Sequence, residues 1–403
     1  MTATTDWGPD LAATLPAALP AEGPTDGAVP TLVGRVWDPK AGGPSVVVVR
    51  DGATYDVSGS FPTVRDLCEQ TDPAAAVADV PGEPLATVAD LLANTPPESR
   101  DATRPWLLAP VDLQAVKAAG VTFVVSMLER LIEERARGEA DAAATVRAEI
   151  TAAIGGGLDE LVPGSPEALR LKAVLRERGM WSQYLEVGIG PDAEIFTKAQ
   201  PLSAVGTATE VGVLAASRWN NPEPEVALVV ASDGRIVGAA LGNDVNLRDV
   251  EGRSALLLPK AKDNNAACAI GPFVRLFDDG FTLDHVRAMT VSLEVRGEDG
   301  FEMLGTSSMR AISRDPADLV GQLIGPHHQY PDGAVLLLGT MFAPSDDRDE
   351  AGMGFTHHAG DVVRISAPEL GTLVNLVRAS EECAPWDFGV ADLMRNLAGR
   401  NLL

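Results

Sequence analysis

The stretch Trp219–Asp244, WNNPEPEVALVVASDGRIVGAALGND, decides the fold, because its pattern predicts two buried strands joined by a tight turn. Residues 226–230 are apolar at every position, which is typical of a strand that is buried on both faces. The Ser-Asp-Gly triplet at 232–234 has turn chemistry, and Arg235–Leu241 predicts the returning strand. We therefore expect a hairpin inside a β-rich core.

Three carboxylates converge at the open end of this hairpin. Glu223 and Glu225 are two residues apart, so their side chains leave the same face of a strand, and folding about the turn sets Asp244 opposite Glu223. Like charges in a low dielectric must be protonated or neutralised, and a hard divalent ion is the usual partner of such oxygen ligands. The alternative is a solvated hairpin end on an edge strand, which Pro222 and Pro224 would permit. The residues alone leave both interpretations open.

An E-x-E pair on a strand, followed by an aspartate, resembles the metal site of the fumarylacetoacetate hydrolase superfamily. The surrounding segments resemble the long-form bacterial members that dehydrate 2-keto-3-deoxy-D-pentonates. The resemblance covers most of the chain from about Ala118 to Leu403 and is carried by WSQYLEVGIGPDAEIFTK, WNNPEPEV, ALGNDVNLRDVEGRSALLLPKAKDNN, CAIGPF, HHQYPDGAVLLLGTMFAP, GFTHHAGDVV and MRNLAGRNLL. It implies an α+β fold, with a β-sandwich or roll as catalytic core, a smaller β-rich N-terminal domain and a helical lid.

The same resemblance implies an activity and a cofactor. The implied reaction is dehydration of a small 2-keto-3-deoxy sugar acid to 2-oxoglutarate semialdehyde, a step of non-phosphorylative pentose catabolism. The implied cofactor is Mg²⁺, which Mn²⁺ could replace, held by Glu223, Glu225 and Asp244. The alternatives are an acylpyruvate hydrolase or oxaloacetate decarboxylase, and a non-catalytic sugar-acid binding protein. Family members commonly form even oligomers, so the resemblance also implies a homodimer or homotetramer.

Two side chains are the candidates for acid and base. Lys262, in KAKDNN, matches the site lysine of the family, with Lys260 as a near rival. A lysine beside a divalent ion is expected to have a lowered pKa, in the range useful for proton transfer. Residues 124–150 predict a long amphipathic helix corresponding to the family's lid, with Ser126 and Glu129 where the family often has His-x-x-Glu. We take Glu129 as the second catalytic candidate and Ser126 as a substrate contact. The alternative is a solvated charged face.

Three further residues are implied as substrate contacts by their places in family motifs. Lys198 lies in a segment that resembles the family's F-x-K strand, and Thr340 ends a Gly-Thr turn whose hydroxyl and backbone amides can hold a carboxylate. Arg248 lies in an Asp-x-x-x-Arg-x-x-Glu pattern, in which Glu251 replaces the family's glutamine and has no assigned role. For the lysine and the arginine, the alternatives are solvent exposure and a surface salt bridge.

Composition and the remaining motifs narrow the class of protein. With 57 acidic against 32 basic residues, the formal charge is -25, which argues against nucleic acid and anionic membranes as partners. No apolar run approaches the ~18 residues of a membrane span, and the N-terminus has no basic region typical of a secretory signal. The pairs 327–328 and 357–358 are adjacent histidines, which face opposite ways on a strand and suit structural or rim positions better than metal binding. We expect a cytoplasmic enzyme.

The chain divides into four expected parts. Residues 1–29 are rich in Ala, Pro, Thr and Gly and predict a loose arm, and residues 30–110 alternate short apolar runs with turns, as in a small β-rich domain. Residues 111–180 predict a helical lid or linker, with a second helix starting at the Ser-Pro-Glu triplet 165–167 and ending near Arg178. Residues 181–403 form the expected catalytic domain.

Overall fold

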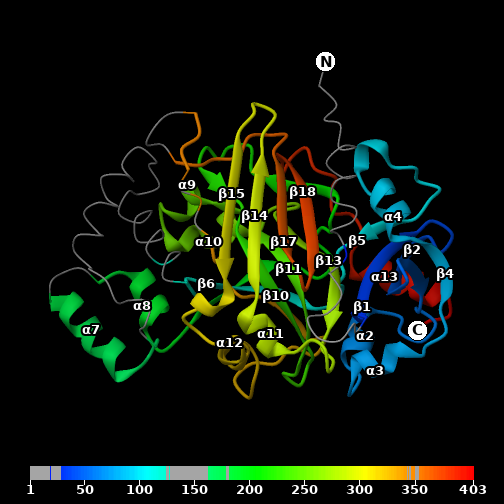
Figure 1. The fold of residues 1–403 in the computed structure, drawn as a ribbon, viewed down its shortest axis with the longest axis horizontal. Helices are drawn as coiled ribbons and strands as arrows, with labels where there is room; N and C mark the ends of the chain where they lie inside the picture. Colours follow the sequence, from blue (N-terminus) through cyan, green and yellow to red (C-terminus); the bar gives the residue numbers. More distant parts are fainter. Residues whose placement is uncertain are drawn as a thin grey trace.

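The computed structural model describes residues 19, 29–123, 127, 162–177, 181–342, 344, 346–349 and 354–403. Within these residues an eleven-stranded sheet packs against a five-stranded sheet, beside a two-stranded ribbon (Figure 1). The helices lie around this β framework. The expectation of a mixed α and β fold with a β-rich core is confirmed.

The strands of the large sheet are β1 (Leu32–Asp38), β2 (Gly43–Arg50), β3 (Ala53–Asp56), β4 (Glu83–Thr87), β5 (Trp106–Leu108), β6 (Ala115–Gly120), β7 (Glu194–Ala199), β10 (Pro224–Val230), β11 (Ile236–Asp244), β13 (Cys268–Leu276) and β16 (Ala334–Leu337). The five-stranded sheet holds β8 (Thr209–Val213), β14 (Thr290–Arg296), β15 (Glu302–Ser308), β17 (Val362–Ala367) and β18 (Gly371–Ala379), and the ribbon consists of β9 (Asn220–Asn221) and β12 (Asn246–Leu247). The described α-helices are α2 (Val64–Cys68), α3 (Pro73–Ala78), α4 (Val88–Asn94), α7 (Pro166–Glu177), α8 (Gln183–Ile189), α9 (Arg248–Glu251), α10 (Leu258–Lys262), α11 (Leu283–Ala288), α12 (Pro316–Leu323) and α13 (Val390–Gly399).

Strand β10 is buried on both faces, as its unbroken apolar run predicts. Val226, Leu228 and Val230 join the hydrophobic cluster between the two sheets. Ala227 and Val229 face the other way, into a cluster shared with the N-terminal strands and helices. The end of this strand therefore lies deep in the molecule, where a charged side chain must find partners.

The hairpin β10–β11 closes about the predicted turn. Ala231 N donates to Arg235 O (2.9 Å), and Gly234 adopts a left-handed backbone with φ of 89°. At the open end, Asp244 N donates to Glu223 O (3.0 Å), so these two residues lie opposite each other. The register predicted from the turn is confirmed.

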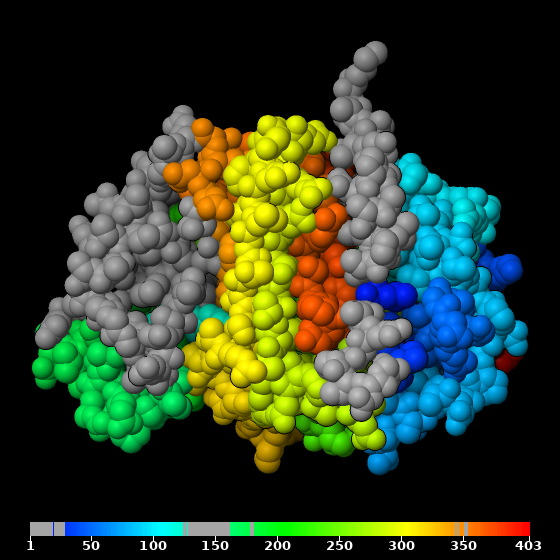
Figure 2. Space-filling model, viewed as in Figure 1, coloured from blue at the N-terminus to red at the C-terminus, as the bar shows by residue number. Residues whose placement is uncertain are grey.

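The N-terminal strands continue the sheet that contains the β10–β11 hairpin. In the order β4-β3-β2-β1-β13-β11-β10-β16-β6-β7, strand β1 pairs antiparallel with β13 and thereby joins residues 32–87 to the central hairpin. Figure 1 shows these strands in blue at one end of the molecule. Figure 2 shows the five-stranded sheet in the middle of one face, between this N-terminal part and helix α7. The domain boundaries expected from the sequence stay predictions.

Of the two helices predicted between residues 111 and 180, the structure describes the second one. Helix α7 is described from Pro166 to Glu177, and Ala168 N donates to the Ser165 hydroxyl (3.1 Å), which confirms the predicted start; the predicted end near Arg178 lies outside the described residues. The predicted lid helix over 124–150, with Ser126 and Glu129, lies outside the described residues. No described helix has the length and apolar character needed to cross a membrane.

Candidate metal centre and active site

The three predicted carboxylates come together at the open end of the hairpin. Glu223, Glu225 and Asp244 each offer an oxygen atom, and these atoms lie within 4.8 Å of one another. All three residues are at most 3% exposed. The solvated alternative for this hairpin end is therefore wrong.

Two buried lysines partly neutralise the three carboxylates. Lys262 Nζ donates to Glu223 Oε2 (2.5 Å) and Asp244 Oδ2 (3.0 Å). Lys198 Nζ lies 2.8 Å from Asp244 Oδ1 and donates to the carbonyls of Val245 (3.0 Å) and Lys262 (2.5 Å). Lys262 therefore lies in the site, whereas its rival Lys260 is exposed. The ammonium group of Lys198 faces a carboxylate ligand and two carbonyls; its role toward substrate stays a prediction.

The third carboxylate, Glu225, has a pKa that is raised by burial. Desolvation raises the pKa of Glu225 well above its ordinary value, and the charges of Asp244 and Glu223 raise it further. Its Oε2 accepts a hydrogen bond from Gly339 N (2.7 Å). Three buried carboxylates beside two lysines form an oxygen-only donor set with excess negative charge, and this set fits a hard divalent ion.

We expect the stabilisation by Mg²⁺ to grow with pH. A carboxyl group whose pKa is higher in the folded than in the unfolded protein stabilises the fold at low pH, and this contribution is lost as the pH rises through the folded pKa. The metal-free protein should therefore weaken as Glu225 ionises, while Mg²⁺ binds the ionised form more tightly. Melting curves at several pH values with and without Mg²⁺ measure the increment in Tm. An increment that is equal at every pH would contradict the prediction, and Glu225→Gln is the control in which the Glu225 contribution is absent.

Gly339 is the residue that allows the backbone to reach Glu225. Its φ is 96°, and a Cβ atom at this position would overlap the Thr122 hydroxyl and lie 2.9 Å from Ala119 O. Glycine is the residue that tolerates both the left-handed backbone and this close approach. The left-handed backbone and the close approach thus explain why the first position of the predicted Gly-Thr turn is a glycine.

Gly339→Ala is expected to lower Mg²⁺ affinity by about tenfold or more, because moving the turn removes a hydrogen bond to a buried charged ligand. Gly300→Ala is the matched control, since Gly300 has a φ of 84° with nothing within 4 Å of a Cβ atom. Both variants should lose stability through the left-handed backbone, by about 1 kcal/mol in the control. Calorimetric Mg²⁺ titration separates them, and equal affinity in both variants would refute the role of Gly339.

A cavity opens beside the three carboxylates. Apart from them, its described lining is formed by Ala119, Gly120, Val121, Glu194, Phe196, Glu251, Lys262 and Thr340. Sequence reasoning missed Glu194 and Phe196. The two residues are two positions apart on strand β7 and so leave the same face, and that spacing was the available signal. Glu251, 3% exposed, belongs to the same lining.

Of the other two predicted substrate contacts, one belongs to the described lining of the cavity and one does not. Thr340 lines it, and its hydroxyl donates to Phe342 O (2.9 Å). Arg248 is buried outside the described lining, with Nε donating to Asn221 Oδ1 (3.0 Å) and the guanidinium 5.5 Å from the Trp219 ring centroid. Their roles toward substrate stay predictions.

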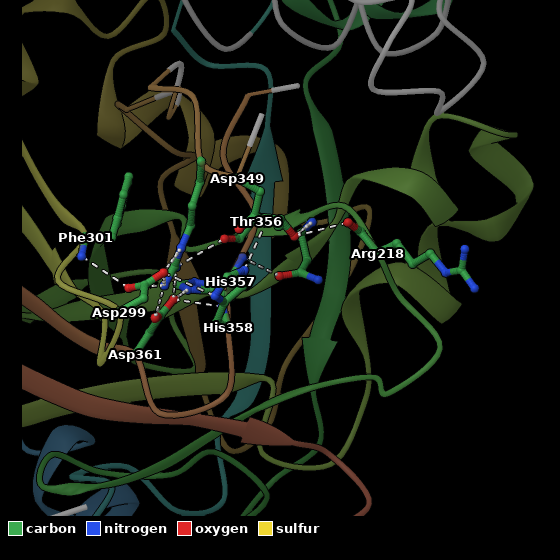
Figure 3. A network of polar contacts seen from close by, with 10 residues as sticks. Arg218, Asp299, Phe301, Asp349, Thr356, His357, His358 and Asp361 are labelled. Carbon is green, nitrogen blue, oxygen red and sulfur yellow. Dashed lines mark hydrogen bonds and ion pairs between the residues drawn. The ribbon is translucent and has the colours of Figure 1, made fainter. Parts of the chain in front are cut away.

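A second polar network supports the strand that leads to Glu223 (Figure 3). The buried Arg348 donates to Asp361 (2.7 and 2.9 Å), which also contacts His357 Nδ1 (3.0 Å). His357 N in turn donates to Asn220 Oδ1 (3.1 Å), on strand β9. Burial lowers the pKa of His357, so a neutral imidazole serves as a structural link, while the side chain of its neighbour His358 is 40% exposed.

Comparisons with known proteins identify the family of this chain. Residues 179–378 match the family described as Fumarylacetoacetate (FAA) hydrolase C-terminal. The chain is 30% identical over 331 residues to the "Probable 2-keto-3-deoxyxylonate dehydratase" of Haloferax volcanii, covering 81% of this chain and 93% of that protein. It is 31% identical over 188 residues to the 2-dehydro-3-deoxy-D-arabinonate dehydratase of Saccharolobus solfataricus, covering 46% of this chain and 58% of that protein. The chain belongs to the fumarylacetoacetate hydrolase family.

Solved structures show the same fold. A 2-keto-3-deoxy-D-arabinonate dehydratase complexed with magnesium and 2,5-dioxopentanoate aligns with a TM-score of 0.59 at 21% identity, covering 87% of this chain and 99% of that one. A 5-carboxymethyl-2-hydroxymuconate delta-isomerase from Mycobacterium smegmatis aligns with a TM-score of 0.50 at 19% identity, covering 86% and 98%. The fold therefore occurs with more than one chemistry, and the reaction must be argued from the site.

Proposed function

We propose that this protein dehydrates 2-keto-3-deoxy-D-xylonate, equally 2-dehydro-3-deoxy-D-arabinonate, to 2-oxoglutarate semialdehyde in non-phosphorylative pentose catabolism. The observation that carries the proposal is the buried triad Glu223, Glu225 and Asp244 with Lys262 directly against it. The names of two relatives at about 30% identity support the substrate class. The magnesium in a structure of the same fold supports the choice of metal.

The residues present account for an elimination. A divalent ion held by the triad would draw charge from the keto oxygen of the substrate and acidify the C3 proton. Lys262 takes this proton as base, and Glu129 protonates the C4 hydroxyl, which leaves as water. The two residues can also exchange these roles. The unsaturated alcohol that results rearranges to an aldehyde at C5, so the reaction needs no oxidant and no covalent intermediate.

Substrate binding is proposed to involve four more residues from separate segments. Arg248 provides positive charge near the triad, Thr340 and Lys198 line or border the cavity, and Ser126 accompanies Glu129 on the lid. The finer architecture belongs to the same proposal: a sandwich or roll core over 181–403, an N-terminal domain over 30–110 and a lid over 111–180. We also propose a homodimer or homotetramer in the cytoplasm.

The deciding experiment is a product analysis. Purified protein with Mg²⁺ is incubated with 2-keto-3-deoxy-D-xylonate, fumarylpyruvate and oxaloacetate, each in a separate reaction. We expect turnover of the sugar acid alone, with 2-oxoglutarate semialdehyde as product. Turnover of fumarylpyruvate or oxaloacetate instead would replace the proposal with a hydrolase or decarboxylase, and binding without turnover would make the protein a binding module.

A further inference from the structure

Glu194 lies in the cavity without belonging to the metal-binding set. Among the described residues, the group of acidic side chains within 4.8 Å of one another consists of Glu223, Glu225 and Asp244. Glu194 lines the same cavity from strand β7. Beside its protein contacts, its carboxylate therefore lines the part of the cavity that the three carboxylates do not occupy.

Strand β7 shows where that part of the cavity lies. Phe196 and Glu194 are two residues apart on one face of the strand, and both line the cavity; Lys198 follows a register shift between Thr197 and Ala199. Lys198 contacts the ligand Asp244, and the Phe196 ring centroid lies 5.6 Å from the Nζ atom of Lys262. Glu194 is the next residue along this face, about 7 Å of strand from Phe196. A substrate chelated at the triad thus passes Lys262 and Phe196 before it reaches Glu194.

The neighbouring strand β6 leaves space for the Glu194 carboxylate, because a glycine lies opposite it. Gly120 on β6 lies directly opposite Glu194 in the antiparallel register. A Cβ atom at Gly120 would overlap Glu194 Oε2, so the carboxylate lies over the bare backbone of β6. The residues on either side, Ala119 and Val121, line the cavity together with Gly120. A glycine at this position therefore sets the direction in which the Glu194 side chain extends.

We propose that Glu194 determines substrate specificity at the tail of the substrate. A carboxylate accepts several hydrogen bonds, so it can receive the distal hydroxyl groups of a 2-oxo acid in addition to its protein contacts. It also repels a second carboxylate at the same place. The site then takes 2-oxo acids with an uncharged, hydroxylated tail and rejects dicarboxylates. The inference rests on the proposed function in so far as the triad binds the 2-oxo acid end.

The test compares two ligands of equal chain length. 2-Oxopentanoate ends in a methyl group, and 2-oxoglutarate ends in a second carboxylate. Their dissociation constants are measured by calorimetry with the full-length protein and Mg²⁺. We expect the wild type to prefer 2-oxopentanoate by about tenfold or more, and the isosteric Glu194→Gln to bring the ratio close to one. A ratio that Glu194→Gln leaves unchanged, or a wild type that binds both ligands equally, would overturn the inference.

Two further variants secure the interpretation. Gly120→Ala should also bring the ratio of the two dissociation constants closer to one, because it displaces the Glu194 carboxylate without changing any charge. Glu302→Gln is the charge-matched control, because Glu302 lies on β15 with a side chain 69% exposed, and its ratio should equal that of the wild type. The readout is binding alone. If the wild type dehydrates no sugar acid, the proposed function is refuted. The ratio of the two dissociation constants still decides the role of Glu194.

Discussion

Chelation is expected to abolish turnover completely, and Mg²⁺ or Mn²⁺ to restore it. The physical reason is that Glu223, Glu225 and Asp244 are buried within 4.8 Å of one another, with excess negative charge that two lysines do not balance. Glu225→Gln removes one charged ligand and should bind metal much more weakly, because a neutral amide is a poorer ligand for a hard cation. The measurements are turnover after exhaustive EDTA treatment and calorimetric titration of Mg²⁺.

The control for Glu225→Gln is Glu302→Gln, which makes the same change on the exposed edge of the small sheet. Its metal affinity should match that of the wild type. Full activity after exhaustive chelation would remove the metal from the proposed reaction.

Loss of either residue proposed to transfer a proton, Lys262 or Glu129, is expected to lower kcat by about 10²–10⁴-fold. Lys262→Met removes the ammonium group that contacts Glu223 and Asp244 in the metal-free protein, so Mg²⁺ affinity should hold or rise while kcat collapses. General structural damage would weaken both quantities together. Glu129→Gln should lower kcat with metal and substrate affinity largely intact, because its contribution is confined to the transition state.

Lys260→Met is the matched control, since Lys260 is exposed and two residues from Lys262 on helix α10. Steady-state kinetics and Mg²⁺ titration of the three variants give the comparison. A near-wild-type kcat for Glu129→Gln would leave Lys262 as the single catalytic candidate, and the solvated-face interpretation of Glu129 would hold. A near-wild-type kcat for Lys262→Met would make this lysine a structural counter-charge.

The sequence by itself determined the local parts of this protein. The unbroken apolar run of β10, the turn at 232–234 and the spacing of Glu223, Glu225 and Asp244 predict the hairpin and its three converging carboxylates. These features depend on residues within one hairpin, where the period of a strand and the geometry of a turn set the positions of the side chains. Resemblance of the KAKDNN segment to a family motif extended this to Lys262, which no local pattern marks.

Only the tertiary structure decided which distant groups complete the site. The second lysine on Asp244, the backbone amide of Gly339 on Glu225, and Glu194 in the cavity come from strands or turns that are adjacent in space and far apart in the chain. An isolated lysine, glycine or glutamate looks the same in a sequence whether it is solvated or buried. Sheet order and register decide between these states, because pairing across the large sheet determines which side chains share one face and one cavity.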